Sequence, residues 1–457
     1  MDVYSIQNHT LSVAKISSGL PAAHRLFQTD LAHSLLYWTK CFPPFTAHRL
    51  QRPGIGDEKK AMEQFRELTV LSLEQATVVP YLTFRLAQDG ARVIRLENPF
   101  SCDPNRLIGA NVMGEDRMNA YFLCINAGKK AITLNLASVE GQEVLRDLIR
   151  ELRVDIFATN QLPKNYRKLG IDYASLKAVK PDIIWLGVTG FGPESNETAY
   201  DPILQARSGL MALTGEPQGD PQVLGIPLPD MGAAEHAYGL VMKALYTRER
   251  TGEGTRIDLS MFESAVSWLT VPLTLFASFG LEITRRGNTH EFFCPVSVYK
   301  TRDGYVYLAV GNDRQWNSIM ALEPFNFLDK EQYQKNAGRI CDVEKLNHAI
   351  NSVTQRFTSE QLLEMFRSIS VPISEIKTVP EVAADPLVER TLITARDPRT
   401  RATITLAPPP AATPFLETNS YELSFPPRLG EHNLEIYGKL PGYSAERLDR
   451  LRETGVI

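Results

Sequence analysis

Short apolar runs alternate with longer amphipathic stretches from Leu68 onward. Pro80 stands where a helix start tolerates proline, and Ser138 is placed to cap a helix that ends near Arg153. The alternation predicts βαβ units, and therefore an α/β fold with a parallel sheet covered by helices on both faces. Such sheets bind ligands at the carboxyl ends of their strands. The expected strands are residues 68–73, 91–96, 130–136, 155–159 and 183–188.

The pattern changes between residues 286 and 385. Two alternating runs within residues 298–310 flank an Asp303-Gly304 turn, which predicts a β-hairpin. Helical periodicity follows, for example from Ser359 to Ile369. We therefore expect a smaller α+β domain here. Proline-rich turns then lead to amphipathic C-terminal helices.

The first 61 residues differ from the rest of the chain. Asp30 is the only acidic residue between Val3 and Gly56, and four of the eight histidines lie in this stretch. An acid-poor N-terminus is typical of a mitochondrial transit peptide, although Trp38 interrupts any amphipathic helix. The alternatives are a disordered extension or a start placed upstream of the natural one at Met62. A chain that begins at Met62 is expected to fold and to be active.

The composition is that of a soluble globular protein, with 43% hydrophobic and 22% charged residues. A net charge of −4 argues against a nucleic-acid or membrane-surface binder held by bulk electrostatics. No apolar run reaches the length of about 18 residues that a membrane-spanning helix needs. The five cysteines form no CxxC pair and the histidines no HExxH, so no zinc site is expected. Scattered cysteines favour a reduced compartment, cytoplasmic or mitochondrial.

Nucleotide chemistry has weak support in the sequence. Glu97 stands where a ribose-binding acid would lie, but the first turn, Glu74–Pro80, has no glycine to let the backbone approach a pyrophosphate. The lone Gly-x-Gly within residues 251–255 fits a tight turn between a helix and a strand. Lys129 and Lys130 could meet phosphates, with a solvated pair as the alternative. The chain contains no GxSxG motif, which argues against a serine hydrolase of that class.

Asp230 is the carboxylate with the most informative surroundings. It stands in a turn rich in proline and glycine, residues 225–234, before an apolar helix that ends near Arg248. A helix N-terminus keeps a carboxylate ionised and offers N–H groups to an oxyanion, and small residues such as Gly232 let a ligand approach. The alternative is an ordinary N-cap aspartate. His236 is expected to be a partly buried helix histidine.

Several stretches, in order, resemble the class III CoA-transferases, a family that includes formyl-CoA transferase, carnitine CoA-transferase and the related α-methylacyl-CoA racemase. The resemblance covers residues 66 to 457 and leaves the first 60 residues outside. The matching stretches are 70–73 with Pro80, 90–97, 126–136, 189–193, 200–217, 248–254 with Asp258 and 260–261, 309–313, 371–374 with 385–386, and 429–432.

The resemblance implies a Rossmann-like large domain that binds CoA and is built from both ends of the chain. It also implies an intertwined homodimer, in which each chain threads a ring made by the other. The expected segments are an N-terminal extension (1–61), the first part of the large domain (62–260), a linker (261–285), a small α+β domain (286–385), and a linker with helices that return to the large domain (386–457).

The resemblance places the catalytic aspartate of the family on Asp230. This carboxylate would attack an acyl-CoA thioester to give an aspartyl-acyl anhydride, and CoA thiolate would convert the anhydride to an aspartyl-CoA thioester. CoA would then pass to the acceptor acid, so that the chain moves CoA from a donor resembling succinyl-CoA to a small carboxylic acid. This is covalent catalysis. It needs no metal or redox cofactor, and the CoA thioester is a substrate.

The chain departs from the family at some positions. The family often has an arginine placed to meet a CoA phosphate where this chain has Asn98, and a glutamine where it has Thr77. Asn160 matches an asparagine used near CoA. A glycine-rich active-site loop has no counterpart within residues 288–298. The predicted set for binding substrate and CoA is Thr77, Asn98, Lys129, Lys130, Asn160, Tyr200 and Gly232.

Two other functions stay open. The related racemase uses a histidine where this chain has Tyr200, and a tyrosine is a poor proton acceptor at neutral pH, so CoA transfer is preferred over racemisation of a 2-methylacyl-CoA. The third possibility is a CoA-binding homologue without activity. Retention of Asp230 and of the small residues after it speaks against that possibility.

Overall fold

The computed structural model describes residues 63–457, which belong to one compact unit. The interpretations given above for residues 1–61 lie outside the described residues. The helices in the described part are α3 (Val78–Gln88), α4 (Ala120–Leu123), α5 (Val139–Glu151), α6 (Tyr173–Val179), α7 (Asp201–Arg207), α8 (Leu210–Leu213), α9 (Leu228–Thr251), α10 (Met261–Ser267), α11 (Thr270–Phe279), α12 (Asp313–Met320), α13 (Asn336–Cys341), α14 (Val343–Thr354), α15 (Ser359–Ser368), α16 (Val379–Ala383), α17 (Pro386–Glu389), α18 (Pro414–Thr418), α19 (Asn433–Tyr437) and α20 (Ala445–Glu453).

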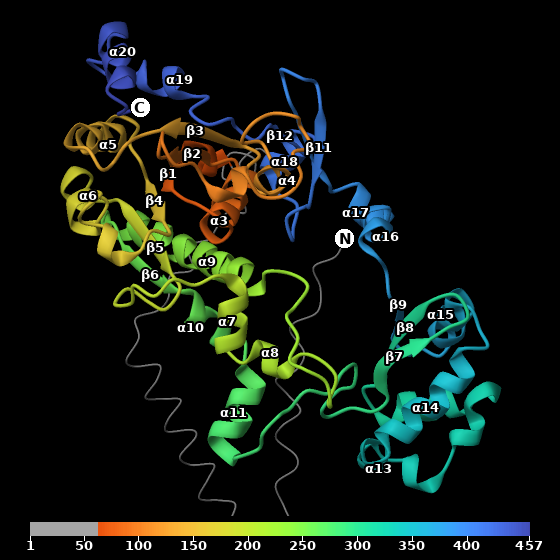
Figure 1. Cartoon of the computed structure of the whole chain (residues 1–457). Coiled ribbons are helices and arrows are strands. Elements are labelled where there is room, and N and C mark those ends of the chain that lie inside the picture. The colour runs from red at the N-terminus through yellow and green to blue at the C-terminus, as the bar shows by residue number, and fades with distance from the viewer. Residues whose placement is uncertain (1–62) are drawn as a thin grey trace, which may run out of the picture. The chain divides into compact units, whose positions relative to one another are not determined.

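A six-stranded sheet, parallel throughout, has the order β3-β2-β1-β4-β5-β6 (Figure 1). This is the strand order of the doubly wound dinucleotide-binding fold, with its switch point between β1 and β4. The predicted parallel sheet is therefore confirmed. Its strands are β1 (Thr69–Leu73), β2 (Arg92–Glu97), β3 (Lys129–Thr133), β4 (Ile156–Thr159), β5 (Ile184–Thr189) and β6 (Arg256–Ser260).

Helices cover both faces of this sheet. Successive residues of a strand point to opposite faces, so neighbouring residues enter different buried clusters. Leu71 and Phe157 pack into one buried cluster with residues of α5, α6 and the C-terminal helices. Their neighbours Val70 and Ile156 pack into a second cluster with residues of α3 and α9. Burial on both faces explains why the strands read as continuous apolar runs.

Local signals placed the helix starts well. Ser138 caps α5 as predicted, since its Oγ accepts a hydrogen bond from Gly141 N at 3.0 Å. Helix α3 begins at Val78, two residues before the predicted start at Pro80. The lone Gly-x-Gly forms the predicted turn between α9 and β6, with Gly252 in the left-handed conformation at φ 71°.

The predicted hairpin is also confirmed. Strands β7 (Val296–Lys300) and β8 (Tyr305–Ala309) pair antiparallel, and β9 (Ile373–Glu375) extends the sheet. Helices α12 to α15 follow in sequence, and Trp316, Ile350 and Phe366 belong to a separate buried cluster with the strands. This part of the chain thus has a core of its own.

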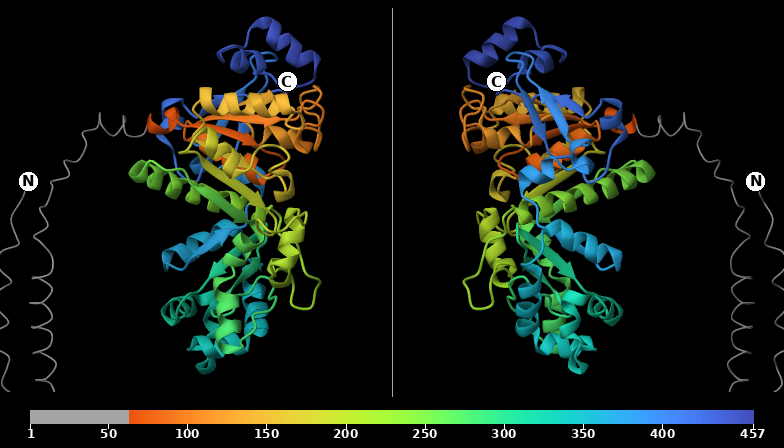
Figure 2. Two further views of the ribbon diagram at one scale, coloured as in Figure 1. Left: turned by 90° about the vertical axis from the view of Figure 1, so that its left-hand side faces the viewer. Right: turned by 90° about the vertical axis from the view of Figure 1, so that its right-hand side faces the viewer.

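The C-terminal residues complete the large α/β core. A third sheet contains β10 (Ile393–Arg396), β11 (Thr403–Leu406) and β12 (Glu422–Ser424). Beyond it, α19 and α20 lie beside β3 and α5 (Figure 2). Tyr437 donates to Thr133 O at 2.7 Å, and Asn135 N donates to Val456 O at 2.8 Å. Residues more than 300 positions apart therefore share one core.

Residues 261–285, predicted to be a linker, contain two helices, α10 and α11. No residue of α11 is buried, although Leu273, Phe276 and Phe279 are large and apolar. Within residues 63–457, no single helix has the length and apolar character to cross a membrane. The pair α10 and α11, bent by 76°, meets that test only when the two are taken together.

Candidate active site

Asp230 is the third residue of α9, and the N-cap of that helix is Pro227. The alternative interpretation of Asp230, as an ordinary N-cap aspartate, is therefore wrong. Its backbone N–H donates to Oδ1 of Asp201, at 3.1 Å, so a carboxylate from another helix caps this donor. Pro229 has no N–H to cap, which leaves a side chain at position 227 little to bind. The Asp230 carboxylate therefore does not cap the end of its helix.

The first-turn N–H groups of α9 were predicted to be available for an oxyanion, and this is also wrong. Besides the bond from Asp230 to Asp201, Leu228 N donates to Ile226 O at 2.8 Å and Met231 N donates to Pro227 O at 3.0 Å. The helix still contributes its dipole. The Thr77 side chain acts on the Asp230 carboxyl group instead, since it opposes the rise in the pKa of that group.

Helix α7 fixes Asp201 and the segment that leads into α9. Gln205 Nε2 donates to Asp201 Oδ2 at 2.6 Å, and Gln205 Oε1 accepts from Leu224 N at 2.9 Å. Both side chains are buried. Asp201 is therefore held with one oxygen on its own helix and the other on Asp230.

Burial and the negative charge of Asp201 together raise the pKa of Asp230 to about 7, and the Thr77 side chain opposes the rise. Burial raises the pKa of Asp201 as well. Two carboxyl groups that share a site in this way disfavour each other's charged form. A carboxyl group that titrates near neutrality is a frequent feature of a catalytic site.

Thr77 lies at the N-terminus of α3 and ends a tightly held loop after β1. Ala76, the residue before it, has a φ of 59°, which is uncommon for a residue with a Cβ. Ala76 N donates to Asp103 Oδ1 at 3.0 Å, and Asn105 Nδ2 donates to Ala76 O at 2.6 Å. These bonds hold the strained residue and so fix the position of Thr77.

Asn160 holds the preceding residue of the same loop. Its Oδ1 accepts from Gln75 N at 3.2 Å, and its Nδ2 donates to Gln75 O at 2.8 Å. Asn160 follows β4 and Gln75 follows β1, so this side chain bridges the switch point where ligands bind in such sheets. Asn160 and Thr77 therefore lie close together at the carboxyl edge, and Thr77 is near enough to Asp230 to affect the pKa of its carboxyl group.

Lys129 is buried, and the expectation of a solvated lysine pair is wrong for it. Its Nζ donates to Glu74 Oε1 at 3.0 Å and to Pro80 O at 2.7 Å. Burial lowers the pKa of Lys129 to about 8, although Glu74 opposes this. Lys129 is buried because successive residues of β3 point to opposite faces, and its side chain points to the interior. Lys130 is half-buried and pairs with Glu435 of α19.

Glu97 belongs to the same buried charge cluster. Burial alone would raise its pKa, but Arg95 and Arg106 lower it to about 2. Arg106 Nε donates to Glu97 Oε2 at 2.8 Å, and Arg95 Nη2 donates to Asp103 Oδ2 at 2.9 Å. Glu97 therefore neutralises buried arginines and does not stand open to a ribose, as the missing glycine already indicated.

The remaining predicted residues lie in different settings. Asn98 Oδ1 accepts from Phe100 N at 2.8 Å, which makes a local turn. Tyr200 is the N-cap residue of α7 and is 76% exposed, one position before Asp201. Gly232 is buried, and a Cβ there would lie 3.3 Å from Trp268 Nε1.

His236 is the partly buried helix histidine that the sequence predicts. It stacks on Trp268 with ring centroids 5.3 Å apart, and its Nδ1 lies 2.7 Å from Ser264 Oγ. The sequence analysis missed Asp201, Asp103, Asn105 and Tyr121. Asp201 follows Tyr200 directly, so it carried a signal that could have been used.

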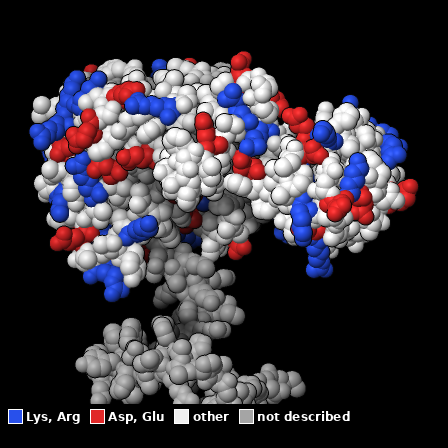
Figure 3. Space-filling view, turned by 90° about the horizontal axis from the view of Figure 1, so that it is seen from below, with Lys and Arg blue, Asp and Glu red and all other residues white. Residues whose placement is uncertain are grey.

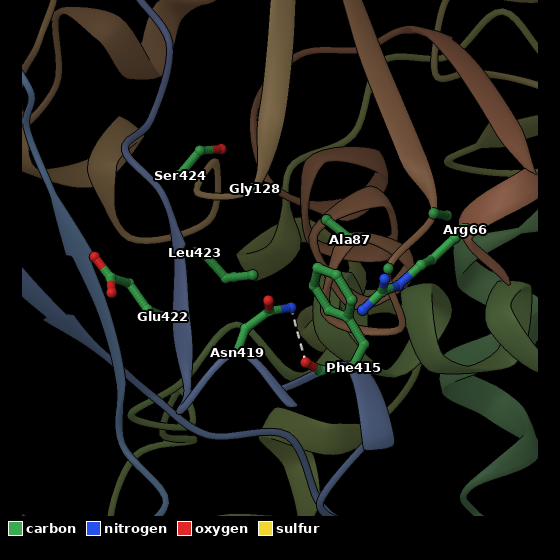
Figure 4. Close-up of a pocket in the computed structure, with 10 residues that line it drawn as sticks. Arg66, Ala87, Gly128, Phe415, Asn419, Glu422, Leu423 and Ser424 are labelled. Carbon is green, nitrogen blue, oxygen red and sulfur yellow. Dashed lines mark hydrogen bonds between the residues drawn. The ribbon is translucent and has the colours of Figure 1, made fainter. Parts of the chain in front are cut away.

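A pocket of about 460 Å³ lies at the opposite edge of the sheet (Figure 4). It is lined by Gly90 and Gly128, which precede β2 and β3, and by Phe415, whose ring lies beneath Arg66 at 5.4 Å. In a parallel sheet these positions mark the amino edge, away from Thr77. This pocket is therefore separate from the Asp230 site.

Two further observations bear on the chemistry. Among residues 63–457, no group of three or more His, Cys, Asp and Glu side chains could hold a metal ion. On the face drawn in Figure 3, basic and acidic residues are interspersed. An extended single-sign patch, which a polyanion would need, is not visible on that face.

Comparison with known proteins identifies relatives over most of the chain. Residues 65–433 match the model of CoA-transferase family III. The chain is 28% identical over 396 residues to succinyl-CoA:glutarate CoA-transferase from Homo sapiens, covering 85% of this chain and 88% of the relative. It is 30% identical over 388 residues to succinate–glutarate CoA-transferase from Agrobacterium fabrum, covering 82% and 94%.

A solved structure is similar as well. The crystal structure of a CAIB/BAIF family protein from Brucella suis matches with a TM-score of 0.71 and 30% sequence identity, covering 82% of this chain and 98% of that one.

Proposed function

Since this chain belongs to CoA-transferase family III and is an acyl-CoA:carboxylate CoA-transferase, we propose that Asp230 carries the covalent step and that the substrates are succinyl-CoA and a small dicarboxylic acid. The single observation that carries the role of Asp230 is that its carboxylate is not used as a helix cap. Asp201 satisfies the backbone N–H of Asp230, at 3.1 Å, and burial together with the negative charge of Asp201 raises the pKa of the Asp230 carboxyl group to about 7.

The proposed reaction begins with the ionised carboxylate of Asp230. One of its oxygens attacks the thioester carbonyl, the C–S bond breaks, and CoA leaves as the thiolate. The thiolate then attacks the Asp230 carbonyl of the mixed anhydride, which releases the donor acid and leaves an aspartyl-CoA thioester. Splitting the exchange in this way replaces one difficult displacement by easier ones.

The second half of the reaction mirrors the first. The carboxylate of the acceptor acid attacks the aspartyl thioester and expels CoA thiolate again. The thiolate attacks the acyl carbonyl of the acceptor in the new anhydride, which forms the product thioester and restores the Asp230 carboxylate. Negative charge on each carbonyl oxygen needs a donor nearby, and Thr77 is the group we assign to this position.

The names of the relatives support the substrate proposal. Both enzymes described above are named for succinate or succinyl-CoA and glutarate. A dicarboxylic acceptor has the same chemistry as the acid that a succinyl-CoA donor releases. We therefore propose that donor and acceptor acids occupy the same subsite in turn.

We also propose that the enzyme is a homodimer. The two connections between the α/β core and the β7–β9 region both expose large apolar side chains, Phe276 and Phe279 in α11, and Val379 and Leu387 in α16 and α17. Exposed apolar surface of this kind marks an interface. A second copy of the chain is the occupant we assign, because two exposed connecting segments fit the intertwined arrangement implied by the family resemblance.

The direct test incubates the full chain with succinyl-CoA and a panel of mono- and dicarboxylic acids, and detects the CoA esters by mass spectrometry. The proposal predicts new CoA esters with dicarboxylates of four to six carbons. Transfer to monocarboxylates alone would contradict the proposed acceptor class. No transfer to any acid, from a folded protein, would contradict the proposed donor. The compartment, cytoplasmic or mitochondrial, stays a prediction.

A further inference from the structure

The side chain of Gln205 joins Asp201 to the segment that leads into α9, and it can do so in only one orientation. A backbone N–H can only donate, so the amide oxygen of Gln205 must face Leu224 N, at 2.9 Å. The amide nitrogen then faces Asp201 Oδ2, at 2.6 Å. Gln205 is 1% exposed, so both ends of its amide are shielded from solvent. The bond to Leu224 therefore fixes which atom of the amide meets Asp201.

Both oxygens of the Asp201 carboxyl group face hydrogen-bond donors. Oδ2 accepts from Gln205, and Oδ1 accepts from the backbone N–H of Asp230 at 3.1 Å. Protonation of either oxygen would weaken the bond that it accepts, and neither donor offers the new proton an acceptor. The surroundings of Asp201 therefore favour its ionised form.

The bond from Asp230 N also brings the two carboxyl groups close together. The carboxyl carbon of an aspartate lies no more than about 4 Å from its own backbone nitrogen, so the carboxyl group of Asp230 is within about 7 Å of Asp201 Oδ1. Asp201 is buried and Asp230 is half-buried. Two negative charges at this distance repel each other in such a site, so one of the two groups gives up its charge more readily than the other.

The group with the better hydrogen-bond donors keeps its charge to lower pH. We propose, on the basis of the proposed function, that Gln205 is a positioning residue that keeps Asp201 ionised and so leaves the proton of the pair on Asp230. Gln205 acts through Asp201 and does not itself take part in the reaction. This arrangement makes Asp230 the more basic carboxylate of the two, and nucleophilicity increases with basicity once the proton has left.

The pKa directions of the two groups agree with this order. Burial raises the pKa of Asp201, and the hydrogen bonds from Gln205 and from Asp230 N oppose the rise. The pKa of Asp230 rises to about 7, in part because of the negative charge of Asp201. Loss of the Gln205 donor should therefore let Asp201 take up a proton more readily, which lowers the pKa of Asp230.

Other titratable groups on the elements packed against this pair have partners of their own or are exposed. The partnered groups are Arg207 with Glu197, Glu235 with Arg85, Glu74 with Lys129, Tyr238 with Asp89, and His236 with Ser264. The exposed ones are Tyr200, Glu216, Asp220, Lys243 and Glu263. Burial raises the pKa of Tyr81 on α3, so that this phenol is neutral near pH 7. The exchange of a proton at this place is therefore set by Asp201 and Asp230.

The test compares Gln205→Met, Asp201→Asn and the double variant. Methionine has nearly the length of glutamine but offers neither the N–H donor nor the carbonyl acceptor. The pH dependence of kcat/KM for succinyl-CoA is measured with saturating acceptor, and each profile is divided by its own plateau. For Gln205→Met we expect the rising limb to move to lower pH by about half a unit, which raises the normalised value at pH 6 about threefold. With asparagine at position 201, Gln205→Met should move the limb no further.

Gln142→Met is the matched control. Gln142 on α5 also joins two segments through its amide, since its Nε2 donates to Leu136 O at 3.0 Å and to Lys168 O at 2.9 Å. Residues of α5 pack on the face of the sheet opposite to α9, so this variant should leave the limb in place. The inference is overturned if Gln205→Met keeps the wild-type limb, moves it to higher pH, or moves it equally in the Asp201→Asn background.

A second measurement needs no variant at position 205 and separates this inference from the proposed function. Carbon NMR of carboxyl-labelled aspartates follows each group by itself, whereas a kinetic profile reports the pair. The two signals are assigned by their disappearance in Asp201→Asn and Asp230→Asn. In the wild type, Asp201 should stay ionised over the pH range in which Asp230 titrates, and this result supports the inference even if the protein transfers no CoA to any acid tested. If Asp201 takes up the proton first in an active transferase, the inference is overturned and the proposed function stands.

Discussion

Asp201 accepts the backbone N–H of Asp230 at 3.1 Å, so that one carboxylate caps the helix that carries the other. The two groups are 29 positions apart in sequence and come from different helices. An aspartate that capped its own helix would have its oxygens committed to backbone N–H groups. Because Asp201 caps the helix, the Asp230 carboxylate is left able to act as a nucleophile. Burial and the negative charge of Asp201 raise its pKa to about 7, so its ionisation depends on pH near neutrality.

Replacement of the proposed nucleophile is expected to abolish turnover. Asp230→Asn should lower kcat by at least about a thousandfold, because an amide oxygen is a poor nucleophile toward a thioester. This corresponds to roughly 4 kcal/mol in the barrier. Asp220→Asn, an exposed aspartate in the preceding loop, is the control and should keep full activity. Wild-type protein with acyl-CoA and no acceptor should carry a CoA adduct on the peptide that contains Asp230. Near-normal turnover in Asp230→Asn would place the nucleophile elsewhere.

The pH dependence of kcat/KM should reflect the interaction between the carboxyl groups of Asp201 and Asp230. Asp230 must be ionised to attack, and its pKa is raised to about 7, so kcat/KM should rise with pH and level off above neutrality. Asp201→Asn keeps an oxygen for the Asp230 N–H but removes the like charge. The rising limb should therefore move to lower pH, by about half a unit to one unit. Glu197→Gln removes an exposed charge beside α7 and should not move it. A shift to higher pH in Asp201→Asn would contradict the electrostatic role.

The same pKa predicts a cost in stability. The folded-state pKa of Asp230 lies above the unfolded value of 3.8, so the folded protein binds more protons and loses stability as the pH rises from about 4 through about 7. Asp230→Asn should remove this loss. We expect it to be more stable than the wild type at pH 8 by on the order of 2 kcal/mol, and by much less at pH 4.5. Urea unfolding at the two pH values measures this, and an equal difference at both would contradict it.

The hydrogen bonds of Asp103 and Asn105 with Ala76 act as a clamp on the loop after β1. This clamp gives a prediction about Asp103. An asparagine at position 103 has a single side-chain oxygen, which cannot accept both from Arg95 and from the N–H of Ala76. Glu74 and Glu97 still pair with Arg95, so we expect a loss of stability of about 2 kcal/mol. Activity should fall at temperatures where the protein is still folded, because Ala76 and Thr77 lose their anchor. Asp116→Asn is the matched control, since Asp116 is exposed and pairs only with Arg117 in the described structure. Full stability of Asp103→Asn would show that the clamp is not needed.

The dimer proposal is tested on α11. Phe276→Glu places a charge on the exposed apolar helix and should reduce association, whereas Phe327→Glu, at a phenylalanine that is 52% exposed, should not. Light scattering across a concentration series measures the mass. Dissociation and unfolding should coincide if the chains are intertwined. A wild-type chain that is monomeric and active at nanomolar concentration would overturn the proposal, and binding of the monomer to lipid vesicles through α11 would point to a membrane instead.

Features that depend on residues close together in the sequence could be predicted, whereas contacts between residues far apart in the sequence could not. The strands and the Ser138 cap follow from signals within a few residues, and these were right. Lys129 looked solvent-exposed because its partner, Glu74, lies 55 positions earlier. The N-cap interpretation of Asp230 failed for the same reason, since the capping group is on α7. The family resemblance indicated Thr77, Asn160 and Asp230, but the contacts of Thr77 with Tyr121, and of Asn160 with both backbone groups of Gln75, arise only when the sheet is assembled.

The closing of the large core by α19 and α20 affects how the chain is synthesised. Strands β1 to β5 leave the ribosome early, but Leu134 and Leu145 share a buried cluster with Tyr437 and Ile457. Part of one face of these early strands therefore stays uncovered while the β7–β9 region is synthesised and forms its separate core. Because domains fold as units in the order of their synthesis, the inserted region completes its fold first. Chaperone binding to the nascent chain should therefore be strongest at the face of the sheet that the C-terminal helices later cover.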